Sequence, residues 1–181
     1  MATDTVGLVN GRLANNLDGA FPDLVRNLQH GVYSGVLRMV PSAADAEDVT
    51  QETFIRAYRA LSEYEPARIR ELNLRGWIWT IALNLCRNAA RTRSRRPRTV
   101  ELVRDAFDTA PGPDALAIEE ADLDYWSQML AKLPPAQRRA VVLRHVVGLT
   151  YGEIAVATRR PSGTVKADVH RGIKKLKEVL A

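Results

Sequence analysis

Apolar residues recur every three or four positions through most of the chain, which predicts helices rather than strands. The pattern indicates helices over residues 21–40 and 43–61, and a third from Trp77 to the arginine-rich run near residue 95. Pro41 separates the first two, because proline disfavours helical geometry in the residue before it, and Ser42 is the predicted N-cap of the second. Residues before about Asn16 show little periodicity, and we expect them to be frayed. The sequence therefore predicts an all-α protein.

The last fifth of the chain predicts two helices joined by a tight turn. Thr150 and Glu153 have the spacing of a capping box, the Arg159–Pro161 run ends the first helix, and Ser162 is a candidate N-cap for the second. The second helix has a predicted buried stripe at helical spacing: Val165, Val169, Ile173 and Leu176. Its other side is basic, which fits the DNA major groove, although basic faces also occur on ordinary helices. The combination favours a helix-turn-helix.

The helix predicted at residues 43–61 has two distinct sides. The buried side is predicted to contain Val49, Thr53, Phe54, Ala57, Tyr58 and Leu61. Residues three and four positions apart form an exposed stripe: Asp48, Gln51, Glu52 and Ile55. Two interpretations of its acids stay open, a binding surface or electrostatic caps, because the helix dipole favours acids in the N-terminal half of a helix.

The third helix combines tryptophans with arginines. Trp77 and Trp79 stand at its start, and a polar side follows: Asn84, Arg87, Asn88 and Arg91. Single-stranded nucleic acid binds where bases stack on aromatic rings and cations hold the backbone. Two core tryptophans followed by a solvated basic tail are the alternative, and we expect core packing for at least one of them, with Trp77 the candidate.

Charge is distributed unevenly over the 181 residues, whose formal net charge is +5. Residues 87–104 are almost purely basic, residues 105–124 contain no lysine or arginine, and the chain is basic again from Lys132. This indicates two nucleic-acid-facing modules and an acidic connector. Cys86 is the single cysteine and no signal peptide or membrane-spanning run occurs, so the sequence predicts a cytoplasmic protein.

Two stretches resemble region 2 of the bacterial extracytoplasmic-function sigma factors, of the sigma-70 family: DAEDVTQETFIRAYRAL at residues 45–61 and LRGWIWTIALNLCRNAARTRSRR at residues 74–96. Residues 133–176 resemble region 4 of the same family. The resemblance covers most of the chain from about residue 20. It implies two small helical domains joined by an acidic flexible linker, with these boundaries: an N-terminal tail 1–17, a region 2 domain 18–97, a linker 98–120 and a region 4 helix-turn-helix domain 121–181.

The resemblance implies a role for each exposed surface. In the family, the exposed side of the first motif docks on the β′ clamp coiled coil of RNA polymerase, which assigns Asp48, Gln51, Glu52 and Ile55. The tryptophan helix and the loop before it recognise and melt the minus-ten element, which assigns Arg75, Trp77, Trp79, Asn84, Arg87, Asn88 and Arg91. The basic helix enters the major groove at the minus-thirty-five element, which assigns Ser162, Thr164, Lys166, Ala167, His170, Arg171 and, nearer the backbone, Lys174.

Other residues leave alternatives open. Asp168 stands where family members often have arginine, and could accept from a cytosine amino group or pair with Arg171. Gly172 lies inside the recognition helix at a cost of about 1 kcal/mol relative to alanine. In the family the interdomain linker threads toward the polymerase active site and the RNA exit channel. The stretch TAPGPDAL at residues 109–116 suits an extended path, with a plain tether as the alternative.

The predicted function is that of an alternative sigma factor, which binds core RNA polymerase at the β′ clamp and β flap, recognises promoter DNA and promotes its melting. A stand-alone LuxR-type regulator is the alternative, and it explains only the C-terminal third. An enzyme is disfavoured, because the three histidines are scattered and no metal-ligand spacing or phosphate-binding loop occurs. We expect no cofactor. The family also implies an anti-sigma factor as a partner.

Overall fold

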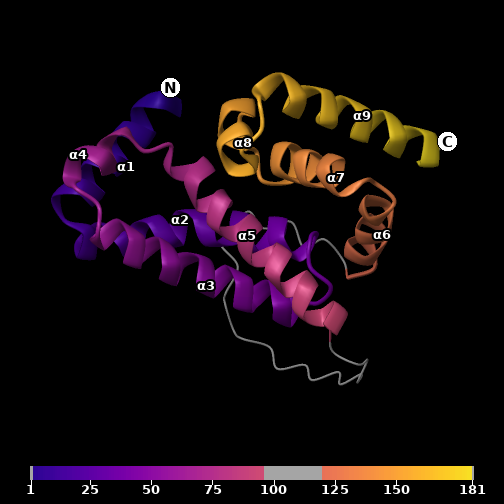
Figure 1. Ribbon diagram of the computed structural model, residues 1–181, viewed down its shortest axis with the longest axis horizontal. Helices are drawn as coiled ribbons and strands as arrows, with labels where there is room; N and C mark the ends of the chain where they lie inside the picture. Colours follow the sequence, from indigo (N-terminus) through magenta and orange to yellow (C-terminus); the bar gives the residue numbers. More distant parts are fainter. Residues whose placement is uncertain (1, 96–119, 181) are drawn as a thin grey trace.

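The computed structural model describes residues 2–95 and 120–180, with side chains for residues 8–89 and 125–180, and every element in this part of the chain is helical (Figure 1). The N-terminal half contains α1 (Ala2–Asn15), α2 (Leu17–Leu37), α3 (Ala43–Ser62), α4 (Pro66–Glu71) and α5 (Leu74–Arg95). The C-terminal half contains α6 (Glu120–Ala131), α7 (Pro135–Val141), a π-helical turn η1 (Val142–Val146), α8 (Tyr151–Thr158) and α9 (Ser162–Leu180). The predicted all-α class is confirmed for the described residues. The stretch TAPGPDAL and nearly all of the predicted linker lie outside them.

The N-terminal segment is a helix that packs on the protein, and the expectation of a frayed start is wrong for its last turns. Leu13 of α1 is 1% exposed. The side-chain amide of Asn10, also buried, donates to the carbonyl of Leu72 at 2.8 Å. This hydrogen bond joins α1 to the loop between α4 and α5. A single buried leucine and a buried amide give no hydrophobic periodicity, so the sequence pattern could not reveal this contact.

Helices α2, α3 and α5 pack together and enclose the core of the N-terminal half. Ser42 caps α3 as predicted, since its hydroxyl oxygen accepts from the backbone N–H of Asp45 at 3.1 Å. The predicted buried side of α3 is confirmed except at Tyr58, which is 37% exposed. The Tyr58 ring packs edge-on against Phe21, and its hydroxyl donates to Asp18 at 2.6 Å. An amphipathic tyrosine can pack its ring and still keep its hydroxyl at the surface.

The C-terminal half contains the predicted helix-turn-helix. Thr150 and Glu153 form the predicted capping box, and α8 ends at Thr158, followed by the C-cap residue Arg159, whose φ of 53° is left-handed. Helix α9 begins at Ser162, so this residue belongs to the first turn instead of preceding it. A Cβ atom at Gly172 would lie 2.6 Å from Cγ2 of Val141. The glycine therefore allows α9 to approach α7 closely, which offsets its low helix propensity.

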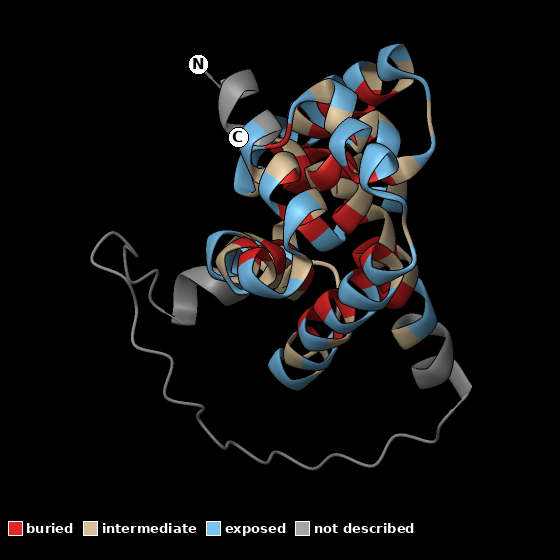
Figure 2. Ribbon diagram, turned by 90° about the vertical axis from the view of Figure 1, so that its left-hand side faces the viewer, coloured by how far each residue is buried: buried red, intermediate tan, exposed pale blue. Residues whose placement is uncertain are grey.

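The two halves are in contact, because α8 lies against the first turns of α5 (Figure 1). One apolar core includes Ile78 and Trp79 of α5 together with Ile154 and Ala157 of α8. Figure 2 shows the buried residues where helices face one another and the exposed residues on their outer sides. A smaller apolar cluster joins the ends of α6, α7 and α9. The packing of α8 on α5 decides which predicted site residues are accessible.

Candidate nucleic-acid and polymerase interface

The predicted polymerase-binding stripe is a surface of α3. Asp48, Gln51 and Ile55 are exposed and Glu52 is half-buried, with Ile55 at 45% exposure. Glu52 accepts a hydrogen bond from Nε of Arg56 one turn later, at 2.6 Å. The structure therefore brings the four residues together on the side opposite the core. Their combination of carboxylates and an exposed isoleucine suits a partner surface that is both cationic and apolar.

The polar side of α5 is only partly accessible. Arg87 and Asn88 are exposed, and Asn84 is half-buried with its side-chain oxygen accepting from Arg87. Arg91 belongs to α5, but its side chain lies outside the described residues. Helical spacing places these four residues on one stripe, as predicted. This stripe offers cationic and amide donors of the kind that hold nucleic-acid phosphates.

The two tryptophans at the start of α5 are packed side chains. Trp79 is only 3% exposed, and Trp77 is half-buried with its ring centroid 5.9 Å from that of Tyr64. The expectation that Trp79 offers a free ring to a base does not hold in this arrangement. The reason is tertiary, since Gly35 of α2 and Val147 of the C-terminal half meet at the Trp79 ring, which also lines a small pocket with Val147.

Arg75 in the first turn of α5 contacts the C-terminal half. Its Nη1 lies 3.4 Å from Oε1 of Glu153 in α8, and its Nη2 donates to the carbonyl of Val147 at 3.4 Å. Both side chains are mostly shielded, with 33% exposure for Arg75 and 12% for Glu153. A predicted promoter-binding arginine is thus engaged by the other half of its own chain.

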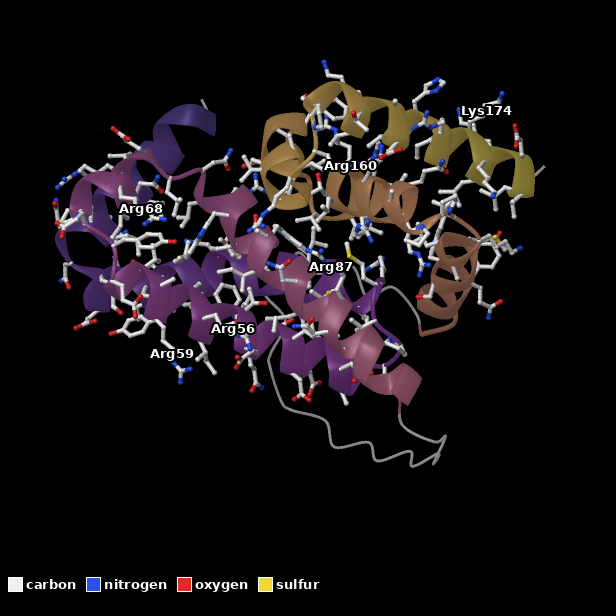
Figure 3. The ribbon with its side chains drawn as sticks, in the orientation of Figure 1. Arg56, Arg59, Arg68, Arg87, Arg160 and Lys174 are labelled. Atoms are coloured by element: carbon white, nitrogen blue, oxygen red, sulfur yellow. The ribbon has the colours of Figure 1, made fainter. Side chains whose placement is uncertain are left out.

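The basic side of α9 is open to solvent. Ser162, Lys166, His170, Arg171 and Lys174 are exposed, and Thr164 and Ala167 are half-buried. The stripe predicted on the opposite side is buried, except that Ile173 is half-buried. Lys174 points away from the protein in Figure 3. The seven predicted residues therefore share one accessible face, whose donors can reach bases and phosphates in a major groove.

Asp168 lies on the inner side of α9 and is 3% exposed. Its carboxylate accepts from Arg160, in the turn after α8, and from Nη2 of Arg171 at 2.8 Å. The structure therefore favours pairing over a contact with cytosine. Arg160 is a residue that the sequence analysis missed, and it lies between the helices of the C-terminal half (Figure 3). The only sequence signal for it was its place in the Arg159–Pro161 run that ends α8.

Burial and neighbouring positive charges shift the pKa values of two side chains, Cys86 and Arg139. Burial raises the pKa of the Cys86 thiol in α5 to about 12. The pKa of Arg139 in α7 is lowered, first by burial and then by the charges of Arg87, Arg160 and Arg138. Arg87 belongs to the N-terminal half, so the contact between the halves brings cations together. In the described ranges, no group of three or more metal-binding side chains occurs, and no helix is long and apolar enough to span a membrane.

Comparison with known proteins matches both halves to one family. Residues 24–96 match Sigma-70 region 2, and residues 123–176 match Sigma-70, region 4. The ECF RNA polymerase sigma-E factor of Escherichia coli (strain K12) is 34% identical, with the alignment covering 84% of this chain and 82% of that protein. The chain belongs to the ECF RNA polymerase sigma factors. It is therefore an alternative sigma factor for transcription initiation, and the LuxR-type alternative, which explained only the C-terminal third, is set aside.

A second sequence relative supports this family assignment, and one solved structure has a similar fold. The ECF RNA polymerase sigma factor SigE of Mycolicibacterium smegmatis is 34% identical over 90% of this chain, which spans 62% of the length of that relative. The fold is similar to that of the sigma factor RpoE in a co-crystal structure with the anti-sigma factor NepR from Bartonella quintana. The TM-score is 0.67 at 22% identity, over 88% of this chain and 96% of that one. The two-part helical fold is thus shared at low sequence identity.

Proposed function

We propose that this sigma factor binds core RNA polymerase through the α3 stripe of Asp48, Gln51, Glu52 and Ile55. The support is that these side chains share one outward face while Phe54 and Ala57 of the same helix are buried. Ile55 supplies apolar area that is not used by the fold, and the carboxylates supply negative charge. A partner surface with cations around an apolar patch complements both.

Promoter recognition is divided between α5 and α9. The exposed Arg87 and Asn88, with Asn84 and Arg91 on the same stripe, contact the minus-ten element, and Arg75 and Trp77 contribute from the start of the helix. Trp79 acts through packing in the core. The basic face of α9 reads the minus-thirty-five element with Lys166, Ala167, His170 and Arg171. Ser162, Thr164 and Lys174 lie beside them and contact the DNA backbone.

Asp168 positions Arg171 on the recognition helix. Its buried carboxylate accepts from one nitrogen of the Arg171 guanidinium, which is 58% exposed as a side chain. The remaining donors of the guanidinium fork stay available for a base edge or a phosphate. Holding the arginine before binding lowers the conformational entropy lost when DNA is contacted.

The chemistry of RNA synthesis belongs to the polymerase, and the sigma factor itself needs no cofactor and acts in the cytoplasm, where promoters and polymerase are. We propose a region 2 domain of residues 18–97, a linker of residues 98–120 and a region 4 domain of residues 121–181, with α1 packed on the first domain. An anti-sigma factor is a further partner of the kind seen with the RpoE relative in its co-crystal structure.

The proposal depends on one observation. The same chain has an outward-facing stripe with two carboxylates on α3, suited to the polymerase, and an exposed basic face on the recognition helix α9. Transcription by purified core polymerase on a promoter library, with and without the protein, tests it. We expect initiation from a defined subset of promoters only when the protein is present. A footprint on duplex DNA without polymerase, together with no effect on initiation, would contradict the proposal.

A further inference from the structure

Helix α1 lies before the residues that match region 2, which begin at residue 24, and it packs on the segment that leads into α5. This segment, residues 66–73, consists of α4 and the two residues after it, Leu72 and Asn73. It continues directly into the helix whose exposed stripe is proposed to contact the minus-ten element. The contacts that hold its shape therefore bear on promoter recognition.

The segment 66–73 has little to hold it in place by itself. Helix α4 has six residues, and helices of this length are marginal in water without tertiary contacts. Its N-cap residue, Glu65, makes no side-chain capping bond, and the last carbonyls of a helix have no partner within it. Ile69 is the one buried side chain of α4. The order of the segment therefore depends on its neighbours.

Asn10 of α1 provides partners for the carbonyls at the end of α4. Its Nδ2 donates to the carbonyl of Leu72 at 2.8 Å and lies within hydrogen-bond distance of the carbonyl of Arg70, at 3.3 Å. Asn10 is 2% exposed, and its Oδ1 has no hydrogen-bond partner among the described residues. A further bond joins the same elements, since Nη2 of Arg70 donates to Oδ1 of Asn15 at 2.8 Å. Helix α1 thus holds the backbone of the segment through the NH2 group of one buried amide.

The side chains of the same segment reach the surface. Leu72 and Asn73 line an open hollow, whose lining also includes Tyr64 and Arg68. The Arg68 guanidinium lies over the Tyr64 ring, 3.6 Å from its centroid. Aromatic rings and guanidinium planes can stack on unpaired bases, and amides can hydrogen-bond to base edges. Asn10 therefore fixes the backbone of residues whose side chains are accessible to a DNA strand.

We propose that Asn10 is a positioning residue for minus-ten recognition, because its bonds to the carbonyls of Arg70 and Leu72 keep the segment 66–73 in the conformation that contacts unpaired DNA. The inference rests on the proposed function, since the shape of the segment matters to promoters only if the start of α5 contacts the minus-ten element. Without these bonds the apparent affinity falls with the fraction of molecules that stay competent. Base discrimination falls as well, because a segment that adapts its shape accepts several bases.

The variants Asn10→Ala and Asn10→Asp test the role of the amide. Alanine removes the donor, and aspartate keeps the shape of asparagine but, when ionised, offers only acceptor oxygens to the two carbonyls. The matched control is Asn16→Ala. Asn16 is the N-cap of α2 and accepts from the N–H of Gly19 at 3.0 Å, so its replacement also lowers stability. The control leaves the bonds between Asn10 and the segment in place.

Amide hydrogen exchange of the free full-length protein reports on the segment directly. We expect faster exchange in peptides that cover residues 66–73 in both Asn10 variants, and wild-type exchange there in Asn16→Ala. Exchange in α9 is the internal reference for folding and should match the wild type in all variants. Unchanged exchange of the segment in a folded Asn10→Ala protein would overturn the proposal, whatever the promoter results.

Binding by the holoenzyme then tests recognition. Core polymerase reconstituted with each variant is titrated with labelled non-template oligonucleotides that carry the minus-ten element with one base changed at a time. In Asn10→Ala we expect the affinity ratio between the best and the worst base to fall by about 2- to 12-fold, the range that corresponds to one lost hydrogen bond. Discrimination between duplexes that differ in the minus-thirty-five element should not change.

Two other results of this titration have different meanings. Equal weakening by Asn10→Ala on every oligonucleotide, with the ratios kept, would make Asn10 a residue of stability alone and overturn the proposal. A wild-type holoenzyme that binds all the oligonucleotides alike would instead refute the minus-ten contact of the proposed function, and the role of Asn10 in recognition with it. The wild-type protein distinguishes the two failures, because only the second one affects it.

Discussion

Reversing the charges of the α3 stripe separates binding from folding. The variant Asp48→Arg with Glu52→Lys replaces two negative charges by two positive ones on exposed and half-buried positions. It removes the pair between Glu52 and Arg56, and pairs of this i,i+4 type contribute about 0.3–0.5 kcal/mol. A new like-charge pair costs a similar amount. The expected total is about 1 kcal/mol of unfolding free energy, or a melting temperature lower by about 2–4 °C.

The effect on polymerase binding should be much larger. Like charges brought together at an interface cost several kcal/mol, and about 3 kcal/mol already weakens binding more than 100-fold. The assay pairs circular-dichroism melting with titration of labelled core polymerase. The control variant is Glu63→Lys with Glu65→Lys, which makes the same change in net charge at exposed positions beyond the stripe. A folded stripe variant that binds core as tightly as the wild type, or a control that loses binding equally, would refute the docking surface.

Three further predictions concern residues that the fold buries. Trp79→Ala should lower the unfolding free energy by about 3–5 kcal/mol in thermal or urea unfolding, whereas Trp126→Ala, at an exposed position, should cost far less. The raised pKa of Cys86 should make stability fall above pH 9, because only the unfolded thiol ionises there. Relative to Cys86→Ala, the loss should reach up to about 1.4 kcal/mol per pH unit in urea titrations, and equal pH profiles would contradict it. Asp168→Asn should cost about 1–3 kcal/mol of stability, because the two arginines that it pairs with stay partly exposed to water. In binding to promoter variants it should relax discrimination only where Arg171 makes contact.

Local sequence was enough to place most elements and their outer faces. The capping box at Thr150 and the N-cap at Ser42 are formed by neighbours three residues apart, and the structure confirms both. The α3 stripe and the basic face of α9 follow from the 3.6-residue period, which orders side chains around a helix without knowledge of its neighbours. The family resemblance added the roles of these faces, which no period can supply.

Only the tertiary structure decided which of those residues are accessible. The contacts of Trp79 with Gly35 and Val147, and of Arg75 with Glu153, join residues far apart in the chain. The sequence around Trp79 has the same residue types and the same spacing whether the ring faces a nucleic-acid base or the protein core. Its burial could therefore not be predicted from the helix alone. Asp168 illustrates the same limit at shorter range, because its partner Arg160 lies across a turn whose path is set by the left-handed Arg159. The sequence determines elements because their hydrogen bonds are local, whereas exposure depends on packing between elements, which is a property of the folded chain as a whole.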